Sequence, residues 1–188
     1  MSEDGTEVAD IDYEKSIKKE RLVYKRKGFF KWMFLVQTGY FLLVAVGFGY
    51  AGINEFVQDS NRILAIFMFL SALFLIASVL CTNVFAKVNG VGLLKNKEDA
   101  FVTLKHFYPD LKIQEVEENA FRIVKLSSSF NTGKSIVVIF HNKNVYFNNA
   151  TLGRASAVTE LFGIFNYLKS KKIATYFTVL QDMAKPTQ

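Results

Sequence analysis

Cysteine, proline and histidine are scarce in this chain of 188 residues, which contains one Cys, two Pro and two His. A single cysteine, Cys81, cannot form a disulfide within the chain or a thiolate-rich metal site. The two histidines, His106 and His141, have no ligand-spaced partner, whereas a zinc site normally needs three or four protein ligands. We therefore predict no metal site, and cysteine usage does not indicate an oxidising compartment.

Charged residues are absent from two long stretches, residues 32–53 and 63–86, which contain 22 and 24 residues. At 1.5 Å per residue each would form a helix of about 33–36 Å, enough to cross a hydrocarbon core of about 30 Å. The first stretch begins too far into the chain, and is too long, for the apolar part of a cleaved signal peptide. We predict that both are transmembrane helices and that together they form a hairpin.

Basic residues are concentrated at the two outer ends of this hairpin. Residues 15–31 contain eight basic residues and one acid, whereas the connector, residues 54–62, contains one basic residue. Because basic flanks remain on the cytoplasmic side, we expect both termini in the cytoplasm and an extracytoplasmic connector. Trp32 and Tyr50 fit interfacial anchors on the inner and outer sides. The sequence thus predicts an integral membrane protein, which we place in a bacterial inner membrane.

The segment before the first apolar stretch changes from acidic to basic. Residues 1–14 contain six acids and no base, which predicts a disordered acidic tail. Residues 15–31 are predicted to be a basic juxtamembrane segment, either a helix lying on anionic headgroups or a plain topology signal. The residues expected at the membrane surface are Lys18, Lys19, Arg21, Lys25, Arg26, Lys27 and Lys31.

Small residues recur at spacings of four within both apolar stretches. Such pairs let helices approach closely inside a bilayer, so we expect them to pack the hairpin or an oligomer. Gly47, Gly49 and Gly52 also match the glycines of a dinucleotide-binding loop, but no βαβ unit follows, and we predict no cofactor. The residues expected in packing are Ala45, Gly47, Gly49, Ala51, Gly52, Ala77, Ser78, Cys81 and Thr82.

Residues 87–188 are predicted to form a small cytoplasmic α+β domain. Apolar spacing favours a helix over 97–107, which Pro109 ends. Stretches of alternating or β-branched residues then favour four strands, and strands joined in succession by short turns form an antiparallel meander. The predicted strands are 112–117, 120–126, 135–140 and 145–149.

An amphipathic helix is expected after the sheet and runs to about Ser170. Its apolar residues recur at helical spacing, and we expect them to help the helices cover one face of the sheet. These residues are Val158, Leu161, Phe162, Phe165 and Leu168. A last short helix is predicted around Tyr176 and Phe177.

Motifs of catalysis and nucleotide binding are incomplete. Gly133-Lys134-Ser135 resembles the end of a phosphate-binding loop, but Ser128 stands where that loop needs glycine, and a strand rather than a helix is predicted to follow. The acids of the domain are scattered, and no nucleophile–base arrangement is evident. We therefore assign no catalytic residue.

The net charge of +6 is compatible with binding to nucleic acid or to anionic lipid. Residues 87–188 contain 14 basic and 8 acidic residues, interleaved along the chain. No nucleic-acid-binding motif is present, and a membrane tether would already hold the domain beside an anionic inner leaflet. We expect contact with lipid rather than nucleic acid. The candidate contact residues are Arg154, Lys169, Lys171 and Lys172.

Three function classes remain open. The favoured hypothesis is a non-enzymatic, adaptor-like protein whose membrane anchor holds a domain that binds a cytoplasmic protein partner. The second is a ligand-sensing or toxin/defence-related effector that forms a homo-oligomer through its hairpin. The third is a membrane-linked enzyme with a site built across the sheet. Recovery of a partner in detergent favours the first, loss of membrane effects on Leu substitution of the glycines favours the second, and a deep polar pocket favours the third.

Overall fold

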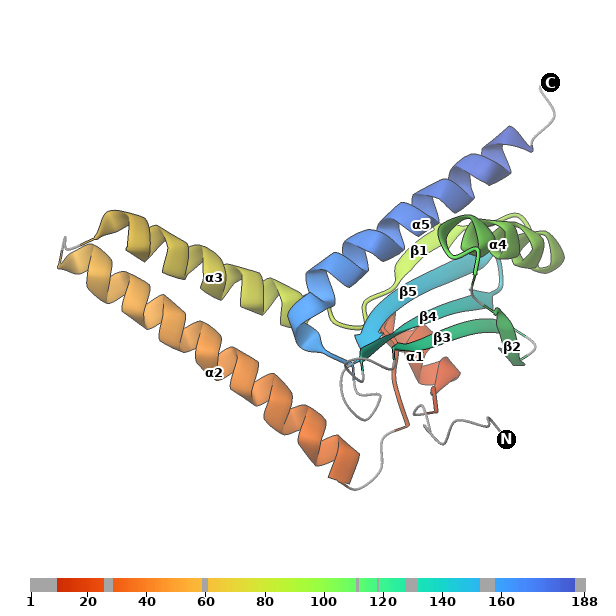
Figure 1. Ribbon diagram of the computed structural model, residues 1–188. Coiled ribbons are helices and arrows are strands. Elements are labelled where there is room, and N and C mark those ends of the chain that lie inside the picture. Colours follow the sequence, from red (N-terminus) through yellow and green to blue (C-terminus); the bar gives the residue numbers. More distant parts are fainter. Residues whose placement is uncertain are drawn as a thin grey trace.

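The computed structural model shows a pair of long apolar helices that extends away from an α+β domain (Figure 1). The described residues are 10–25, 29–58, 61–110, 112–117, 119–127, 132–152 and 158–184. The helices are α1 (Tyr13–Lys19), α2 (Phe29–Val57), α3 (Arg62–Cys81), α4 (Leu93–Phe107) and α5 (Gly163–Met183), with a 3₁₀ turn η2 (Glu160–Phe162) before α5. The strands are β1 (Ala86–Asn89), β2 (Gln114–Glu117), β3 (Ala120–Ser127), β4 (Thr132–His141) and β5 (Asn144–Leu152).

Helices α2 and α3 lie side by side as an apolar hairpin (Figure 1). Both are long and apolar enough to cross a membrane. Asn61 begins α3, because its side-chain oxygen accepts a hydrogen bond from the Leu64 backbone N–H at 3.0 Å. Only 6% of the most apolar stretch of α2 and 17% of that of α3 is buried within the structure. The core helix of a soluble domain would be mostly buried.

Helix α3 ends at Cys81, five residues before the predicted boundary. Thr82 is extended and Asn83 has a positive φ of 64°, a conformation that Asn tolerates better than most residues, so the chain leaves the helical path. Phe85 and Ala86 follow, both only 5% exposed, as part of the domain core. The apolar run therefore continues from a helix into an edge strand, and hydropathy alone cannot detect that change.

The sheet has the strand order β1-β5-β4-β3-β2, and all its neighbours are antiparallel. The predicted four-stranded meander, β2 to β5, is confirmed, and β1 adds a fifth strand beside β5. Strands β4 and β5 are joined by a two-residue turn at Asn142 and Lys143, in which Asn142 has a positive φ of 54°.

Both faces of the sheet are covered (Figure 1). Side chains alternate between the faces of a strand, so Ile136, Val138 and Phe140 of β4 face the core beneath α4 and α5. Val137 and Ile139 face the opposite side, where they pack with apolar residues of the N-terminal segment. This double burial explains why β4 reads as a continuous apolar run.

The N-terminal segment lies on the sheet. Ile11 and Leu22 are each only 3% exposed, and Ile11 forms an antiparallel bridge with Tyr24. Ser16 is fully buried, and its hydroxyl accepts a hydrogen bond from Val23 N–H at 2.8 Å. Residues 1–9 of the predicted acidic tail lie outside the described residues, whereas residues 10–14 belong to this folded segment.

Helix α5 buries a different side from the one its apolar spacing suggested. The side chains that face the sheet and α4 come from Ser170 onward, namely Ser170, Ile173, Ala174, Phe177 and Gln181. Leu161, Phe162, Phe165 and Leu168 are between 36% and 57% exposed. The helix also continues without a break to Met183, so the prediction of a separate last helix around Tyr176 and Phe177 is wrong.

Candidate functional site

The hairpin meets the domain where the last turns of α3 lie against η2 and the start of α5. Gly163 is so close to α3 that a Cβ there would overlap the Ser78 carbonyl oxygen and lie 2.6 Å from Thr82 Oγ1. Thr82 Oγ1 itself donates to the Ser78 carbonyl at 2.8 Å. The contact is therefore backbone against backbone, and only glycine fits it.

Two further contacts fix this junction. The rings of Phe74 on α3 and Phe165 on α5 have centroids 5.6 Å apart. Glu160 of η2 is only 1% exposed and accepts a hydrogen bond from Thr38 Oγ1 of α2 at 3.0 Å. Burial of a carboxyl group is costly unless it is hydrogen-bonded, so Thr38 helps to hold η2 against α2.

The N-terminal segment forms the third side of the junction. Arg21 donates from Nη2 to the carbonyl oxygens of Leu80 and Thr82, each at 2.9 Å. These carbonyls end α3, where the helix dipole favours a cation. The neighbouring backbone is paired as well, since Leu22 N–H donates to Asn83 O at 2.7 Å. The domain and the hairpin are thus connected by several fixed contacts rather than by a bare linker.

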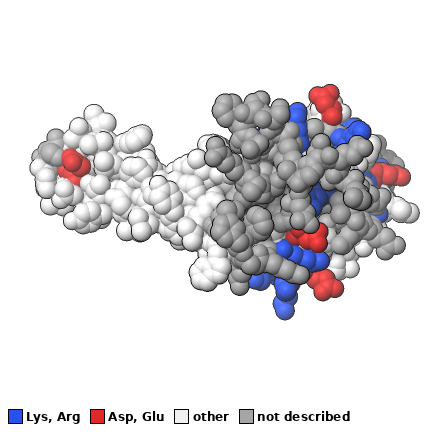
Figure 2. Space-filling model, turned by 60° about the horizontal axis from the view of Figure 1, so that its bottom comes forward, with Lys and Arg blue, Asp and Glu red and all other residues white. Residues whose placement is uncertain are grey.

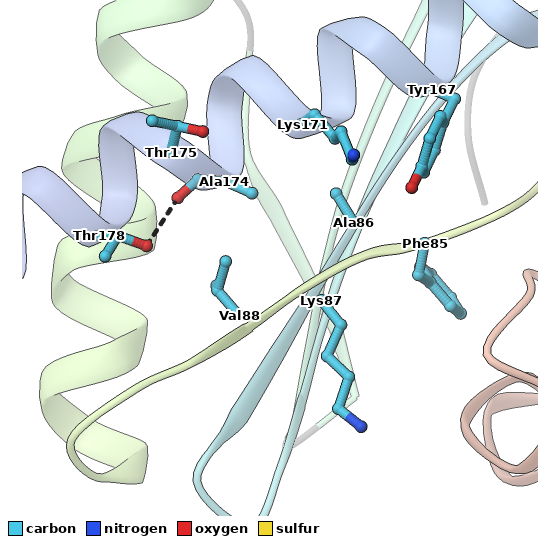
Figure 3. Close-up of a pocket in the computed structure, with 9 residues that line it drawn as sticks. All are labelled: Phe85, Ala86, Lys87, Val88, Tyr167, Lys171, Ala174, Thr175 and Thr178. Atoms are coloured by element: carbon cyan, nitrogen blue, oxygen red, sulfur yellow. Dashed lines mark hydrogen bonds between the residues drawn. The ribbon is translucent and has the colours of Figure 1, made fainter.

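A groove lies between β1 and α5 (Figure 3). Its volume is about 560 Å³, which falls within the range of small-molecule sites. The strand side is Phe85, Ala86, Lys87 and Val88, and the helix side is Tyr167, Lys171, Ala174, Thr175 and Thr178. Strand β1 is at the edge of the sheet: the N-terminal segment pairs with Val84 and Phe85 just before it, and β1 itself pairs only with β5 among the described strands.

The groove is basic and aromatic in character, and none of its lining residues is acidic. Lys171 Nζ lies 5.3 Å from the centre of the Tyr167 ring, and Figure 3 shows both side chains on the helix side of the groove. Lys87 Nζ forms an ion pair with Glu20 at 2.8 Å, and this hydrogen bond raises the pKa of Lys87. Lys171 is therefore the more available cation for an acidic ligand.

The structure separates the small residues predicted to pack the hairpin. Gly52 lies against α3, because a Cβ there would be 3.1 Å from Phe69 and 3.2 Å from the Ala65 carbonyl, whereas Gly47 and Gly49 have open space for 4 Å. The others range from buried to half-buried. Ala45, Ser78 and Thr82 are buried, and Ala51, Ala77 and Cys81 are half-buried.

The predicted membrane-surface residues do not form one group. Lys18, Lys19 and Lys25 are exposed on the N-terminal segment, while Arg21 is engaged at the end of α3. Arg26, Lys27 and the side chain of Lys31 lie outside the described residues, as does Arg154.

The three lysines of α5 point to different surroundings. Lys169 Nζ lies 4.7 Å from the Tyr108 ring centre, and its pKa is lowered mainly by burial, with Lys134 and Lys172 adding to the effect. Lys171 lines the groove, and Lys172 is exposed beside it.

The remaining candidate groups have ordinary packing positions. His106 stacks on Tyr176 with ring centroids 4.4 Å apart, and His141 is exposed at the end of β4. Among the described residues, no group of three or more His, Cys, Asp or Glu side chains could hold a metal ion. Gly133 is the second residue of β4, so it is followed by a strand and not by a helix, as predicted.

Sequence reasoning missed a buried polar cluster that joins α4 to α5. Gln181 Nε2 donates to Asn96 Oδ1 at 2.9 Å and to Asp99 Oδ2 at 3.2 Å. Lys95 Nζ pairs with Asp99 at 2.7 Å, and this hydrogen bond raises the pKa of Lys95. Asn96 also accepts from Val91 N–H at 2.9 Å. Such polar residues look like surface positions in sequence, so only their burial identifies them as a structural cluster.

Comparisons with known proteins give no match: no protein-family model, curated protein or solved structure matches this chain. The function therefore has to be inferred from the chain's own residues. The two features that bear on it are the exposed apolar hairpin and the groove beside β1.

Proposed function

We propose that this chain is an integral membrane protein in which α2 and α3 cross the bilayer and the domain faces the cytoplasm. We further propose that it acts as a non-enzymatic, adaptor-like protein that holds a partner-binding domain at the membrane surface. The observation that carries this proposal is the exposure of the two apolar helices beside a domain that has its own core.

The exposed surface of the hairpin is almost entirely apolar. Leu43, Val46 and Ile63 are 72%, 71% and 82% exposed. Soluble monomers rarely leave a continuous apolar patch of this extent open to water. A bilayer would cover it, and helices satisfy their own backbone hydrogen bonds, as the hydrocarbon region requires.

The distribution of charge supports a cytoplasmic domain. On the face shown in Figure 2, Lys and Arg lie at the domain end among some acidic side chains, the arm is white along its length, and acidic side chains appear at its tip. Basic flanks stay on the cytoplasmic side, so this pattern favours a tip outside and a domain inside. A bacterial inner membrane fits that arrangement.

The groove beside β1 supports binding of an extended partner segment. An exposed edge strand can take up a further strand through backbone hydrogen bonds, while neighbouring pockets select side chains. Lys171 and Tyr167 border the strand edge, so we infer that the bound segment carries acidic side chains. The lining contains no paired nucleophile and base, which favours binding over catalysis.

Photo-crosslinking tests this site in the intact protein. With p-benzoylphenylalanine in place of Thr175, we expect one discrete protein adduct in native membranes. Lys171→Glu should reduce its yield roughly tenfold, because a repelled acidic segment would lose about 1.4 kcal/mol of binding free energy. Lys172→Glu is the matched control, since Lys172 is exposed but does not line the groove.

The same crosslinker at Met183 serves as the reference position, because Met183 is 81% exposed and lies outside the groove on the same helix. Equal adducts from Met183 and Thr175, or an adduct insensitive to Lys171→Glu, would count against the groove as the binding site.

An oligomeric effector is the second candidate, and one observation favours it. Gly47 and Gly49 present small residues on α2 with nothing of the described chain within 4 Å. Gly47 forms a small-xxx-small pair with Ala51, and such pairs let transmembrane helices of separate copies approach closely. Gly47→Leu and Gly49→Leu separate this candidate from the first, because they should reduce the size of an oligomer.

A further inference from the structure

The 3₁₀ turn η2 and the first part of α5 present an apolar stripe to the outside of the molecule. Leu161, Phe162, Phe165 and Leu168 are 36%, 42%, 57% and 54% exposed, respectively. The opposite side of α5 is packed against the sheet and α4 from Ser170 onward. The stripe is therefore not part of the domain core, although its spacing is that of an amphipathic helix.

The stripe begins within the apolar length of the hairpin. Phe165 contacts Phe74, which lies seven residues before the end of α3, or ~10 Å along a helix. Glu160 contacts Thr38, which lies six residues beyond Trp32 on α2, or ~9 Å. Contacts on two helices thus place η2 and the start of α5 at a similar depth.

The apolar surface of α2 continues beside this segment. Trp32, Leu35 and Val36 are 68%, 51% and 67% exposed, and they precede Thr38 toward the domain end of α2. At the level of Thr38, η2 contacts both α2 and α3. A bilayer that covers the exposed apolar part of α2 would also cover the stripe.

Basic residues follow the stripe along α5. Lys169, Lys171 and Lys172 follow Leu168 immediately, and Lys171 and Lys172 are exposed. In an interfacial helix, cations of this kind lie among anionic headgroups while the apolar side faces acyl chains. Figure 1 shows α5 starting beside the end of α3 and running away from the hairpin over the sheet.

We propose that η2 and the first turns of α5 form a third membrane element, embedded in the cytoplasmic leaflet with Leu161, Phe162, Phe165 and Leu168 against acyl chains. This proposal rests on the proposed membrane insertion of α2 and α3. It also sets the orientation of the domain, because α5 is part of the domain core and is fixed to α3 at Gly163.

Depth-dependent fluorescence quenching of the full chain tests it. Single cysteines replace Leu161 or Leu168 in a Cys81→Ser background and carry an environment-sensitive fluorophore. The protein is reconstituted in phosphatidylcholine–phosphatidylglycerol vesicles that contain a phosphatidylcholine with a spin label on its acyl chain. Leu43 provides the reference within the hairpin, and Met183 provides the reference on the far end of α5.

We expect both stripe positions to lose roughly half of their fluorescence with a shallow acyl-chain label, because the apolar side of an interfacial helix lies about 5–10 Å into the leaflet. Leu43 should respond to a deep label, and Met183 to neither. Quenching at Leu43 without quenching at Leu161 and Leu168 would overturn the third element and leave the hairpin in place. Absence of quenching at Leu43 would overturn the proposed membrane insertion itself. Equal quenching at Met183 and Leu168 would also overturn the third element, since all of α5 would then lie in the lipid.

Discussion

Gly163→Ala should destabilise the protein by about 1–3 kcal/mol or more, the cost of forcing an extra methyl group into a packed contact. The new Cβ would overlap the Ser78 carbonyl oxygen and lie 2.6 Å from Thr82 Oγ1. A backbone carbonyl within a helix cannot rotate aside, so α5 would have to move away from α3. The prediction is checked by thermal unfolding of the purified protein in detergent, where we expect the midpoint to fall by several degrees.

Gly49→Ala is the matched control for this substitution. Gly49 also lies in a helix but has nothing of the described chain within 4 Å. Alanine is favoured over glycine in helices by roughly 0.5–1 kcal/mol, so helix propensity alone would make both variants equal to or more stable than the natural chain. A Gly163→Ala protein as stable as the Gly49→Ala protein would contradict the close junction between α3 and α5.

Gly52→Leu should separate the two helices of the hairpin at a cost of about 1–3 kcal/mol or more. A Cβ at this position would already lie 3.1 Å from a Phe69 ring carbon, 3.2 Å from the Ala65 carbonyl and 3.3 Å from the Met68 Cβ. Alanine would need only a small shift, whereas the branched leucine side chain has no room. Unfolding of the detergent-solubilised protein by increasing sodium dodecyl sulfate measures this loss.

Gly47→Leu and Gly49→Leu test two further positions on the same helix. Both glycines have open space beside them, so neither substitution should lower the stability of the single chain. Equal destabilisation at Gly47, Gly49 and Gly52 would show that α2 is rotated from the described position. If the protein is instead an oligomeric effector, Gly47→Leu and Gly49→Leu should reduce the size of the complex without unfolding the chain.

The sequence predicted the elements whose side-chain patterns are local. Four strands were found because β-branched and turn residues alternate between Lys112 and Asn149, and the charge-free stretches marked α2 and α3. Strand β1 was missed, since Val84, Phe85 and Ala86 extend an apolar run and reveal no change of period. The charge pattern of the N-terminal segment predicts a disordered tail and a basic juxtamembrane segment, and it hides Ile11 and Leu22, which pack on the sheet.

The candidate sites depend on contacts between distant parts of the chain. The groove lies between β1 and α5, which is about 80 residues further along the chain. Because β1 was not predicted, there was no sheet edge at which a groove could be expected. The stripe on α5 has the spacing of a core-facing helix, and only its neighbours Phe74 and Thr38 show where it lies. Likewise Gly163 carries no sequence signal, because its role comes from the close approach of Ser78 and Thr82 on α3.

Cysteine labelling in intact bacterial cells tests the membrane arrangement most directly. In a Cys81→Ser background, one cysteine replaces Gln58 at the tip of the hairpin and another, in a separate variant, replaces Lys143 in the exposed β4–β5 turn. In the proposed orientation, a membrane-impermeant maleimide should label the Gln58 position in spheroplasts and the Lys143 position only after lysis. Labelling of the Lys143 position in intact spheroplasts, or release of the protein from membranes without detergent, would contradict it.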